Sequence, residues 1–314
     1  MLRRIIFILL LLAVAGCGKQ SPEPPQVQDF YPQDGYHGFK RGEAITITFN
    51  EPMDPASTEA AFQLLDPSGT PVEVNFKWED GSRLLLITPA NPLAYSSDDR
   101  YLNYRYLLST DARSQKGAAL NKGLYVTFST LRTFKTTILS DANYDGYVAK
   151  SGSLYTYNNE NIIRFGDDNH NVAFRGFLSF TLPTKITELV DATFKLYMVR
   201  ITYPFVGQPL IEWVDLGDEL DDSDFDAAPL SDTPINQGGS NWVRNTYITY
   251  SVDELVRLAL EEDRERFQLR LRFSRNTNGD FRENIVFLYA REALDDPSVT
   301  EDQLSVLEIS YYSP

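Results

Sequence analysis

The sequence predicts an all-β protein built from two β-sandwiches, of which the second is larger and carries one short helix. Apolar and polar residues alternate over short runs along most of the chain, as they do in half-buried strands. Clusters of Gly, Pro, Asp and Ser separate these runs, and such clusters form the turns between strands. With 314 residues, of which 42% are hydrophobic and 13% aromatic, the chain can fill two cores of ordinary domain size.

The first 16 residues have the composition of a secretory signal peptide. Arg3 and Arg4 form a basic start, residues 5–14 are almost all apolar, and the small residues Ala15 and Gly16 follow. That order is typical of an exported protein. The apolar run is too short for a membrane-spanning helix, which needs about 20 residues. We therefore expect residues 1–16 to be removed.

Cys17 is the only cysteine in the chain, and it stands directly after this leader. The sequence Val14-Ala15-Gly16-Cys17 resembles the lipobox of bacterial lipoproteins. The resemblance implies cleavage before Cys17 and acylation of its thiol and new amino group with fatty acids such as palmitate, which anchor a protein firmly to a membrane. An ordinary secretory signal that ends near a cysteine by chance is the alternative. A lone cysteine also excludes disulfides within the chain.

The residues after Cys17 predict a tether and a location. Gly18 follows the cysteine, in place of the aspartate of an inner-membrane retention signal, so the resemblance implies the outer membrane or the cell surface. The segment also contains Pro22, Pro24 and Pro25, and segments rich in proline act as extended spacers. We expect residues 17–27 to be a lipidated cysteine followed by a flexible tether.

Residues 28–135 are predicted to form the first sandwich. No helical period runs through them, and five runs alternate apolar with polar residues. These runs are 45–49, 72–76, 84–87, 104–108 and 125–128. Five short strands within about 100 residues are typical of an antiparallel sandwich.

Spaced motifs in this segment carry a resemblance to a known family. They are Tyr31-Pro32-Gln33-Asp34-Gly35, Ile45-Thr46-Ile47-Thr48-Phe49-Asn50-Glu51-Pro52-Met53-Asp54, Trp78 before Asp80-Gly81, Thr88-Pro89, Pro92-Leu93-Ala94-Tyr95 and Phe128-Ser129-Thr130. In this order they resemble the bacterial Ig-like domain of S-layer proteins, over about residues 28–132. A polar insertion at 96–103 departs from the family pattern. The resemblance implies an Ig-like spacer or presentation module at the cell surface, with no catalytic residues.

Residues 136–314 are predicted to form the second, larger sandwich, of jelly-roll size. Its strand-like runs are 146–148, 162–165, 177–180, 193–198, 247–250, 267–273 and 304–311. One helix is expected between the runs 247–250 and 267–273. Ser251 is a candidate N-cap, and Glu254 stands three residues later as in a capping box. The apolar residues that follow share one helix face: Val252, Leu255, Val256, Ala259 and Leu260.

A looser resemblance covers about residues 138–312. It rests on Arg175-Gly176-Phe177-Leu178-Ser179-Phe180, Asp191-Ala192-Thr193-Phe194-Lys195-Leu196-Tyr197, the helix, and Leu307-Glu308-Ile309-Ser310-Tyr311. Their order resembles DNRLRE-type domains, which are secreted jelly-roll modules, some of them similar to carbohydrate-binding modules. The loop at 213–230 is longer and more acidic than the family pattern.

Two loops of the second sandwich carry oxygen ligands suited to calcium. Asp141, Asn143 and Asp145 match the first half of an EF-hand loop, but its twelfth position is Gly152 in place of glutamate. The other loop contains Asp167, Asp168 and Asn169. Neither loop is complete, so a structural calcium ion would have to draw on both loops, on backbone carbonyls or on water. Ordinary polar turns are the alternative.

Several aromatic residues are candidate platforms for sugar rings. The predicted ligand-binding residues are Trp213, Trp242 and Tyr203, and Tyr155, Tyr157 and Phe205 are further candidates. The alternative is that these rings belong to the core or to cross-strand pairs, as most aromatic residues of a sandwich do.

The charge of the chain and its missing motifs exclude several functions. The net charge of −15 repels phosphate backbones, so we expect no nucleic-acid partner. Residues 215–226 contain seven acids, which either collect divalent cations or keep the protein soluble. We find no nucleophile elbow, phosphate-binding loop or paired-histidine motif, and we expect no enzyme.

These observations lead to one hypothesis and one alternative. The hypothesis is a non-catalytic cell-envelope lipoprotein in which an Ig-like spacer presents a module that binds glycan or another envelope polymer. The alternative is a structural or assembly protein of the envelope that docks another protein. Exposed aromatic rings in a groove favour the first, and a flat apolar patch favours the second.

Overall fold

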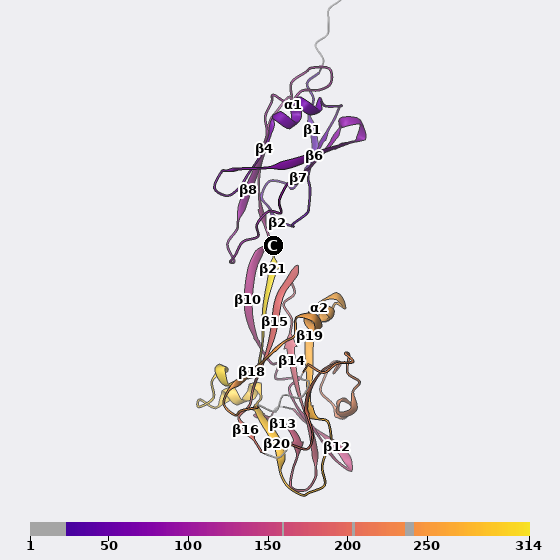
Figure 1. Cartoon of the computed structure of the whole chain (residues 1–314), viewed down its shortest axis with the longest axis vertical. Coiled ribbons are helices and arrows are strands. Elements are labelled where there is room, and N and C mark those ends of the chain that lie inside the picture. The colour runs from indigo at the N-terminus through magenta and orange to yellow at the C-terminus, as the bar shows by residue number, and fades with distance from the viewer. Residues whose placement is uncertain (1–22, 159, 203–204, 236–241) are drawn as a thin grey trace, which may run out of the picture. The chain divides into compact units, whose positions relative to one another are not determined.

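The computed structural model describes residues 23–158, 160–202, 205–235 and 242–314 (Figure 1). The predicted signal peptide, Cys17 and Tyr203 lie outside the described residues. The chain divides into two units, of which the first comprises the described residues up to Ala94 and Leu102–Thr130. The second comprises Tyr95–Tyr101 and Leu131–Pro314. Strands dominate both units, so the all-β prediction is confirmed.

No helix in the described ranges is both long enough and apolar enough to cross a membrane.

The first unit is a sandwich of two sheets. One has the strand order β1-β3-β7-β6 and the other β2-β9-β8-β4-β5, and all neighbours are antiparallel except β2 and β9. The bounds are β1 Val27–Tyr31, β2 Tyr36–Phe39, β3 Ile45–Phe49, β4 Phe62–Leu65, β5 Pro71–Val72, β6 Val74–Glu79, β7 Leu84–Pro89, β8 Asn103–Leu108 and β9 Leu124–Thr130. Alternate residues of the central strands enter the core between the sheets, including Ile45, Ile47 and Phe49 of β3.

A short helix that the alternation did not predict stands between β3 and β4. This helix, α1 (Pro55–Ala60), begins after Asp54, whose carboxylate accepts the N–H of Ser57 at 3.1 Å. Proline at the first helical position has the backbone angle that a helix needs and no N–H to lose. The pair Asp54-Pro55 is therefore typical of a helix N-terminus, but α1 is too short to show the periodic spacing of apolar residues that predicts a helix.

The second unit also contains two sheets. The first has the order β10-β21-β15-β18. The second has the order β12-β11-β14-β13-β20-β16, and β19 joins β14 and β17 beside it. The bounds are β10 Arg132–Leu139, β11 Gly146–Ser151, β12 Ser153–Asn158, β13 Ile162–Asp167, β14 Ala173–Thr181, β15 Glu188–Tyr197, β16 Arg200–Ile201, β17 Pro209–Val214, β18 Tyr247–Ser251, β19 Arg266–Phe273, β20 Asn284–Tyr289 and β21 Val306–Ser313.

The main core of the second unit lies between these sheets. Phe194 and Leu307 come from one sheet, and Phe180 and Phe267 from the other. The predicted helix, α2 (Asp253–Glu261), buries Val256 and Ala259 against the same core. The larger sandwich with its helix thus has the layered form that the strand pattern predicted, because each sheet buries one apolar face.

The predicted cap of α2 is wrong by one residue. Ser251 is the last residue of β18, and Val252 occupies the N-cap position without a capping side chain. Ser251 donates its hydroxyl to Asp253 instead, at 2.7 Å. Asp253 also accepts the backbone N–H of Ala192. Ser251 is therefore part of the strand pairing of β18 and does not cap the helix. The carboxylate of Asp253 links the start of the helix to β15.

Residues 95–101, which include most of the polar insertion of the Ig-like segment, belong to the second unit. Tyr95 donates its hydroxyl to Glu188 at 2.8 Å, and its ring packs edge-on against Tyr312 with centroids 4.7 Å apart. The guanidinium of Arg132 lies 4.1 Å from the ring centre of Tyr101. The expected division after residue 135 falls inside β10, which belongs wholly to the second unit.

Candidate functional site

Trp213 and Trp242 are core residues, so their prediction as ligand-binding platforms is wrong. Each is 3% exposed. Trp213, on β17, stacks against Phe267 with centroids 6.2 Å apart. Trp242 packs edge-on against Phe165 at 5.8 Å and donates its indole N–H to Tyr250 at 3.1 Å. A platform for a sugar must offer an open ring face, and these rings have none.

Tyr155 and Tyr157 of β12 are the exposed aromatic residues among the sequence candidates. They are 53% and 39% exposed, and they lie on the same face of the strand because they are two residues apart. β12 is an edge strand that pairs with β11. Tyr157 lies opposite Tyr147 of β11, and the two rings stack at 4.8 Å with an interplanar angle of 14°.

An arginine lies beside two buried rings under these strands, Tyr147 and Phe174. The guanidinium of Arg164, on β13, lies 4.4 Å from the ring centre of Tyr147 and 5.3 Å from that of Phe174. It also donates to the Tyr147 hydroxyl at 2.8 Å. Burial raises the pKa of Tyr147. We define the tyrosine face by the residues Tyr147, Tyr155, Tyr157, Arg164, Phe174 and Phe287.

The tyrosine face combines two exposed aromatic rings with the guanidinium of Arg164. Open tyrosine rings stack on the apolar face of a pyranose, and their hydroxyls exchange hydrogen bonds with water or sugar. Arg164 supplies planar donors that are oriented by cation–π contacts. The pattern Leu154-Tyr155-Thr156-Tyr157 signalled the two tyrosines in the sequence, whereas Arg164 and Phe287 carried no local signal, because strand pairing alone brings them there.

The two predicted calcium loops lie at opposite ends of one strand pair. Asp167 pairs with Asn284 at one end of β13 and β20, and Ile162 pairs with Tyr289 at the other. Asp145 lies beyond that second end, where it accepts the N–H of Arg291 at 3.1 Å. Five strand residues separate the ends by about 17 Å. The alternative in which one ion draws on both loops is therefore wrong, and calcium held by one loop with backbone carbonyls and water stays a prediction.

In the loop that contains Asp167, Asp168 and Asn169, the side chain of Asp168 binds backbone N–H groups. Asp168 accepts the N–H groups of His170 and Val172, at 2.8 and 2.9 Å, which closes a polar turn. Asn169 is exposed, whereas Asp167 is fully buried under residues 277–284, and this burial raises its pKa. In the described part of the chain, no three His, Cys, Asp or Glu side chains converge as a ready-made metal site.

The acidic loop at 215–226 is folded onto the second unit. Its last part is a single-turn helix, Asp222–Asp226, which Asp221 caps. Phe225 is fully buried and holds the loop to a small core that includes Val148 and Phe177. Asp224 is buried, and this burial raises its pKa to about 6. The loop is therefore more than a solvated charge run.

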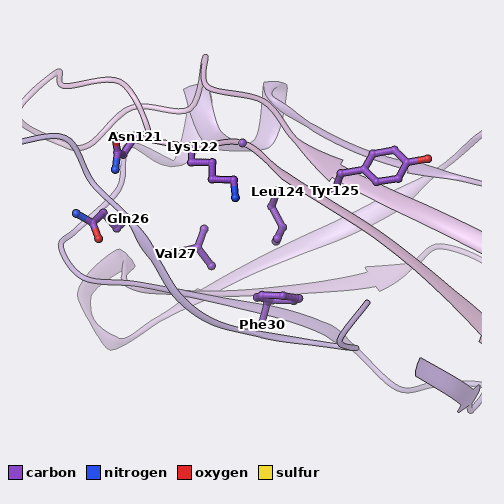
Figure 2. A pocket seen from close by; sticks show the side chains of 8 residues that line it. Gln26, Val27, Phe30, Asn121, Lys122, Leu124 and Tyr125 are labelled. Carbon is purple, nitrogen blue, oxygen red and sulfur yellow. The ribbon is translucent and has the colours of Figure 1, made fainter. Parts of the chain in front are cut away.

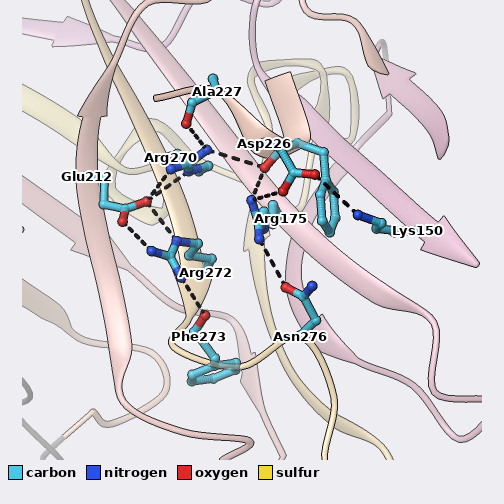
Figure 3. Close-up of polar contacts among 10 residues, drawn as sticks. Lys150, Arg175, Glu212, Asp226, Ala227, Arg270, Arg272, Phe273 and Asn276 are labelled. Atoms are coloured by element: carbon cyan, nitrogen blue, oxygen red, sulfur yellow. Dashed lines mark hydrogen bonds and ion pairs between the residues drawn. The ribbon is translucent and has the colours of Figure 1, made fainter. Parts of the chain in front are cut away.

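Beneath this loop lies a network of charged residues (Figure 3). Glu212 of β17 is 4% exposed and binds two arginines of β19, Arg270 at 2.7 Å and Arg272 at 2.5 Å. Burial by itself would raise the pKa of Glu212, but Arg272 and Arg270 outweigh it and hold that pKa below its usual value. Arg270 also donates to the carbonyl of Ala227 at 2.6 Å, which fastens the loop from below.

Arg175 of β14 extends this network toward the surface. It pairs with Asp226 at 3.1 Å and donates to Asn276 at 3.0 Å (Figure 3). Burial, together with the charges of Arg270 and Arg272, lowers the pKa of Arg175 to about 10. Because these arginines are occupied by protein carboxylates and carbonyls, the network holds the acidic loop in place.

An apolar groove of about 600 Å³ lies on the first unit, beside the first residues of β1 and β9. Figure 2 shows Val27, Phe30 and Leu124 converging on it from two segments, whereas Tyr125 points away. Gln26, Asn121 and Lys122 form its polar rim. Tyr125 is 60% exposed. The groove is thus an apolar surface of the first unit that is open to solvent.

Comparison with known proteins identifies the first unit. Residues 21–130 match the family described as bacterial Ig-like domain. The match covers the first unit, so the predicted resemblance is confirmed there. No curated protein sequence matches the chain. The DNRLRE-type resemblance and the lipobox stay predictions.

Solved structures give only distant likenesses. The N-terminal part of the bacterial S-layer protein SbsC is 12% identical over 51% of this chain and 41% of its own, with a TM-score of 0.26. Native α2-macroglobulin from Escherichia coli, domains MG0-NIE-MG1, is 11% identical over 74% and 62%, with a TM-score of 0.27. The LD transpeptidase LdtMt1 with imipenem is 14% identical over 60% and 65%, with a TM-score of 0.23. The chain thus spans less than half of the S-layer structure it matches.

Proposed function

We propose that this chain is a non-catalytic cell-envelope lipoprotein whose second unit binds a glycan or another envelope polymer. Lipid on Cys17 anchors it to the outer membrane or cell surface, and the bacterial Ig-like unit acts as the spacer. The tyrosine face carries this proposal, because it combines two exposed aromatic rings with a fixed arginine. Tyrosine, phenylalanine and arginine do not titrate near neutral pH, so this face suits binding and not acid–base catalysis.

A glycan-array screen of the purified protein tests the binding proposal. We expect Tyr155→Ala and Tyr157→Ala each to weaken binding about tenfold, the effect of losing about 1.4 kcal/mol of ring contact. Tyr125→Ala removes a tyrosine that is 60% exposed on the first unit, and we expect it to bind like the wild type. If the wild type and the three variants bind glycan equally well, the tyrosine face is not the binding site.

The second candidate function is a structural or assembly protein that docks another envelope protein. The apolar groove of the first unit favours it, because Val27, Phe30 and Leu124 leave an apolar surface open where β1 and β9 begin (Figure 2). Cross-linking in the envelope distinguishes the two candidates. If Leu124→Asp abolishes capture of one envelope protein and no glycan binds, the docking function replaces the glycan function.

The anchor makes a separate prediction. Each buried methylene of an acyl chain contributes about 0.8 kcal/mol to membrane binding, so several chains on Cys17 hold the protein in the membrane. We expect Cys17→Ser to move the protein to the soluble fraction or to leave the leader uncleaved. Mass spectrometry of the N-terminal peptide checks the modification directly. A peptide without added lipid mass contradicts the lipobox reading.

A further inference from the structure

β12 is an open edge of the second sheet of the second unit. It pairs with β11 on one side, and in the described part of the chain no strand pairs with its other side (Figure 1). In an antiparallel pair, alternate residues direct their N–H and C=O groups to the partner strand, and the residues between them direct theirs away. The backbone of β12 makes no hydrogen bond to any described segment other than β11. Backbone donors and acceptors are therefore free along this edge.

This edge also lacks the sequence features that protect edge strands from other chains. Natural proteins block such edges with lysine, with proline or with a bulge. β12 contains no charged residue and no proline, and its register with β11 runs without a shift. Its two tyrosines and its threonine favour extended backbone. The edge is thus suited to accept an added strand.

The two faces of β12 have different surroundings. Leu154 packs against the small core under the acidic loop, and Thr156 donates its hydroxyl to Asp222 at 2.6 Å. On the opposite face, Tyr155 and Tyr157 are exposed. Side chains of neighbouring strands lie beside each other on the same face of a sheet. An added strand would therefore place one set of alternate side chains beside the acidic loop and the other set beside the tyrosines.

A hollow of about 430 Å³ lies between β12 and the acidic loop. Thr156 and Asn158 line it from the strand, and the carboxylates of Glu219, Asp221 and Asp222 line it from the loop. Within the described ranges, no basic side chain pairs with these three carboxylates. The hollow thus presents uncompensated negative charge at the place where side chains of an added strand would lie.

We propose that the edge of β12 binds an extended segment of another protein as an added strand, with lysine or arginine at the positions that face Glu219, Asp221 and Asp222. The residues between them, which lie beside Tyr155 and Tyr157, are apolar or aromatic. Main-chain hydrogen bonds supply the affinity of such a strand, and its alternate side chains supply the selectivity. The inference goes beyond the glycan proposal, because it concerns the backbone of β12 and its acidic side.

The same charges argue against a second copy of this chain as the occupant. Two β12 edges would pair across a two-fold axis, with the same surface contributed by each copy. Such pairing would bring the three carboxylates of each copy to the same face of the joined sheet, where they repel one another. The net charge of −15 adds to this repulsion. A basic segment is attracted instead, so the occupant is a different polypeptide.

Fluorescence polarisation with a labelled peptide of about eight residues, in which lysine and valine alternate, tests the proposal on the purified protein. We expect saturable binding to the wild type. A peptide with glutamate in place of lysine should bind at least tenfold more weakly, because it meets like charges. A lysine–valine peptide that is methylated on its backbone nitrogens should also bind at least tenfold more weakly, because it keeps its charges but cannot donate to the edge.

Glu219→Lys tests the acidic side of this surface. Glu219 is exposed, so we expect the variant to fold like the wild type and to bind the lysine–valine peptide about tenfold more weakly. Glu261→Lys is the matched control, because it makes the same change of charge on α2, which packs against β15 and β19. It should bind the peptide like the wild type. We expect Glu219→Lys to bind glycan normally, since the rings of Tyr155 and Tyr157 are unchanged, so failure of this inference is distinct from failure of the glycan proposal.

Four results overturn the proposal. The wild type does not bind the lysine–valine peptide, or it binds the methylated peptide equally well, in which case charge alone holds the peptide. Glu219→Lys binds the peptide as tightly as Glu261→Lys, in which case the acidic side has no part in binding. The fourth result is a wild type that is dimeric in analytical ultracentrifugation and becomes monomeric in the variant Tyr155→Lys, since a second copy then occupies the edge.

Discussion

Glu212→Gln should lower the free energy of unfolding of the second unit by about 3–5 kcal/mol, the usual cost of removing one member of a buried ion pair. Glu212 and Arg270 are 4% and 3% exposed, so water cannot replace the lost carboxylate. The neutral amide leaves the charges of Arg270 and Arg272 close together without a counter-ion. Because Arg270 also holds the carbonyl of Ala227, we expect the acidic loop to loosen at the same time.

Asp226→Asn is the matched control for this change. It also removes one carboxylate from the network, but the side chain of Asp226 is 61% exposed in its pairs with Arg175 and Lys150. Exposed pairs contribute about 0.2–1 kcal/mol, because water screens them. Urea unfolding followed by circular dichroism measures both variants. If both variants lose the same free energy of unfolding, burial does not explain the contribution of the Glu212 pair to stability.

Trp213→Ala should lower the free energy of unfolding by about 3–5 kcal/mol, as large-to-small changes in a core do. The indole is 3% exposed and stacks on Phe267, with the guanidinium of Arg264 5.5 Å from its ring centre. Its removal leaves a cavity between β17 and β19 that these rigid strands cannot close. Any ligand of the tyrosine face should still bind the variant at a temperature where it remains folded.

Tyr155→Ala is the control, because we expect it to keep the stability of the wild type but to weaken glycan binding. Its ring is 53% exposed, so we expect a stability change within about 0.5 kcal/mol and the about tenfold weaker glycan binding given above. Thermal melting and the glycan array together separate the two roles. The assignment of the tyrosine face is wrong if folded Trp213→Ala no longer binds glycan while Tyr155→Ala binds it as tightly as the wild type.

The alternation of apolar residues predicted strands where one face is buried and the other is not. In β3 (Ile45–Phe49) every second side chain enters the core, and the prediction matches the observed bounds. It failed for β12, where no residue is buried, and for β20, where no residue is exposed. Neither strand sets a buried face against an exposed one, which is the contrast that the prediction relied on.

The sequence by itself determined the all-β class, the short strands and the Ig-like character of the first unit, because these depend on neighbouring residues and on turn chemistry. It also placed Asp141, Asn143 and Asp145 at the spacing of an ion loop. Only the tertiary structure decided that Trp213 and Trp242 are buried while Tyr155 and Tyr157 are open. It alone brought Arg164 over the ring of Tyr147. The reason is physical: a period of two tells which side chains share a face of a strand, whereas sheet pairing and packing decide what covers that face.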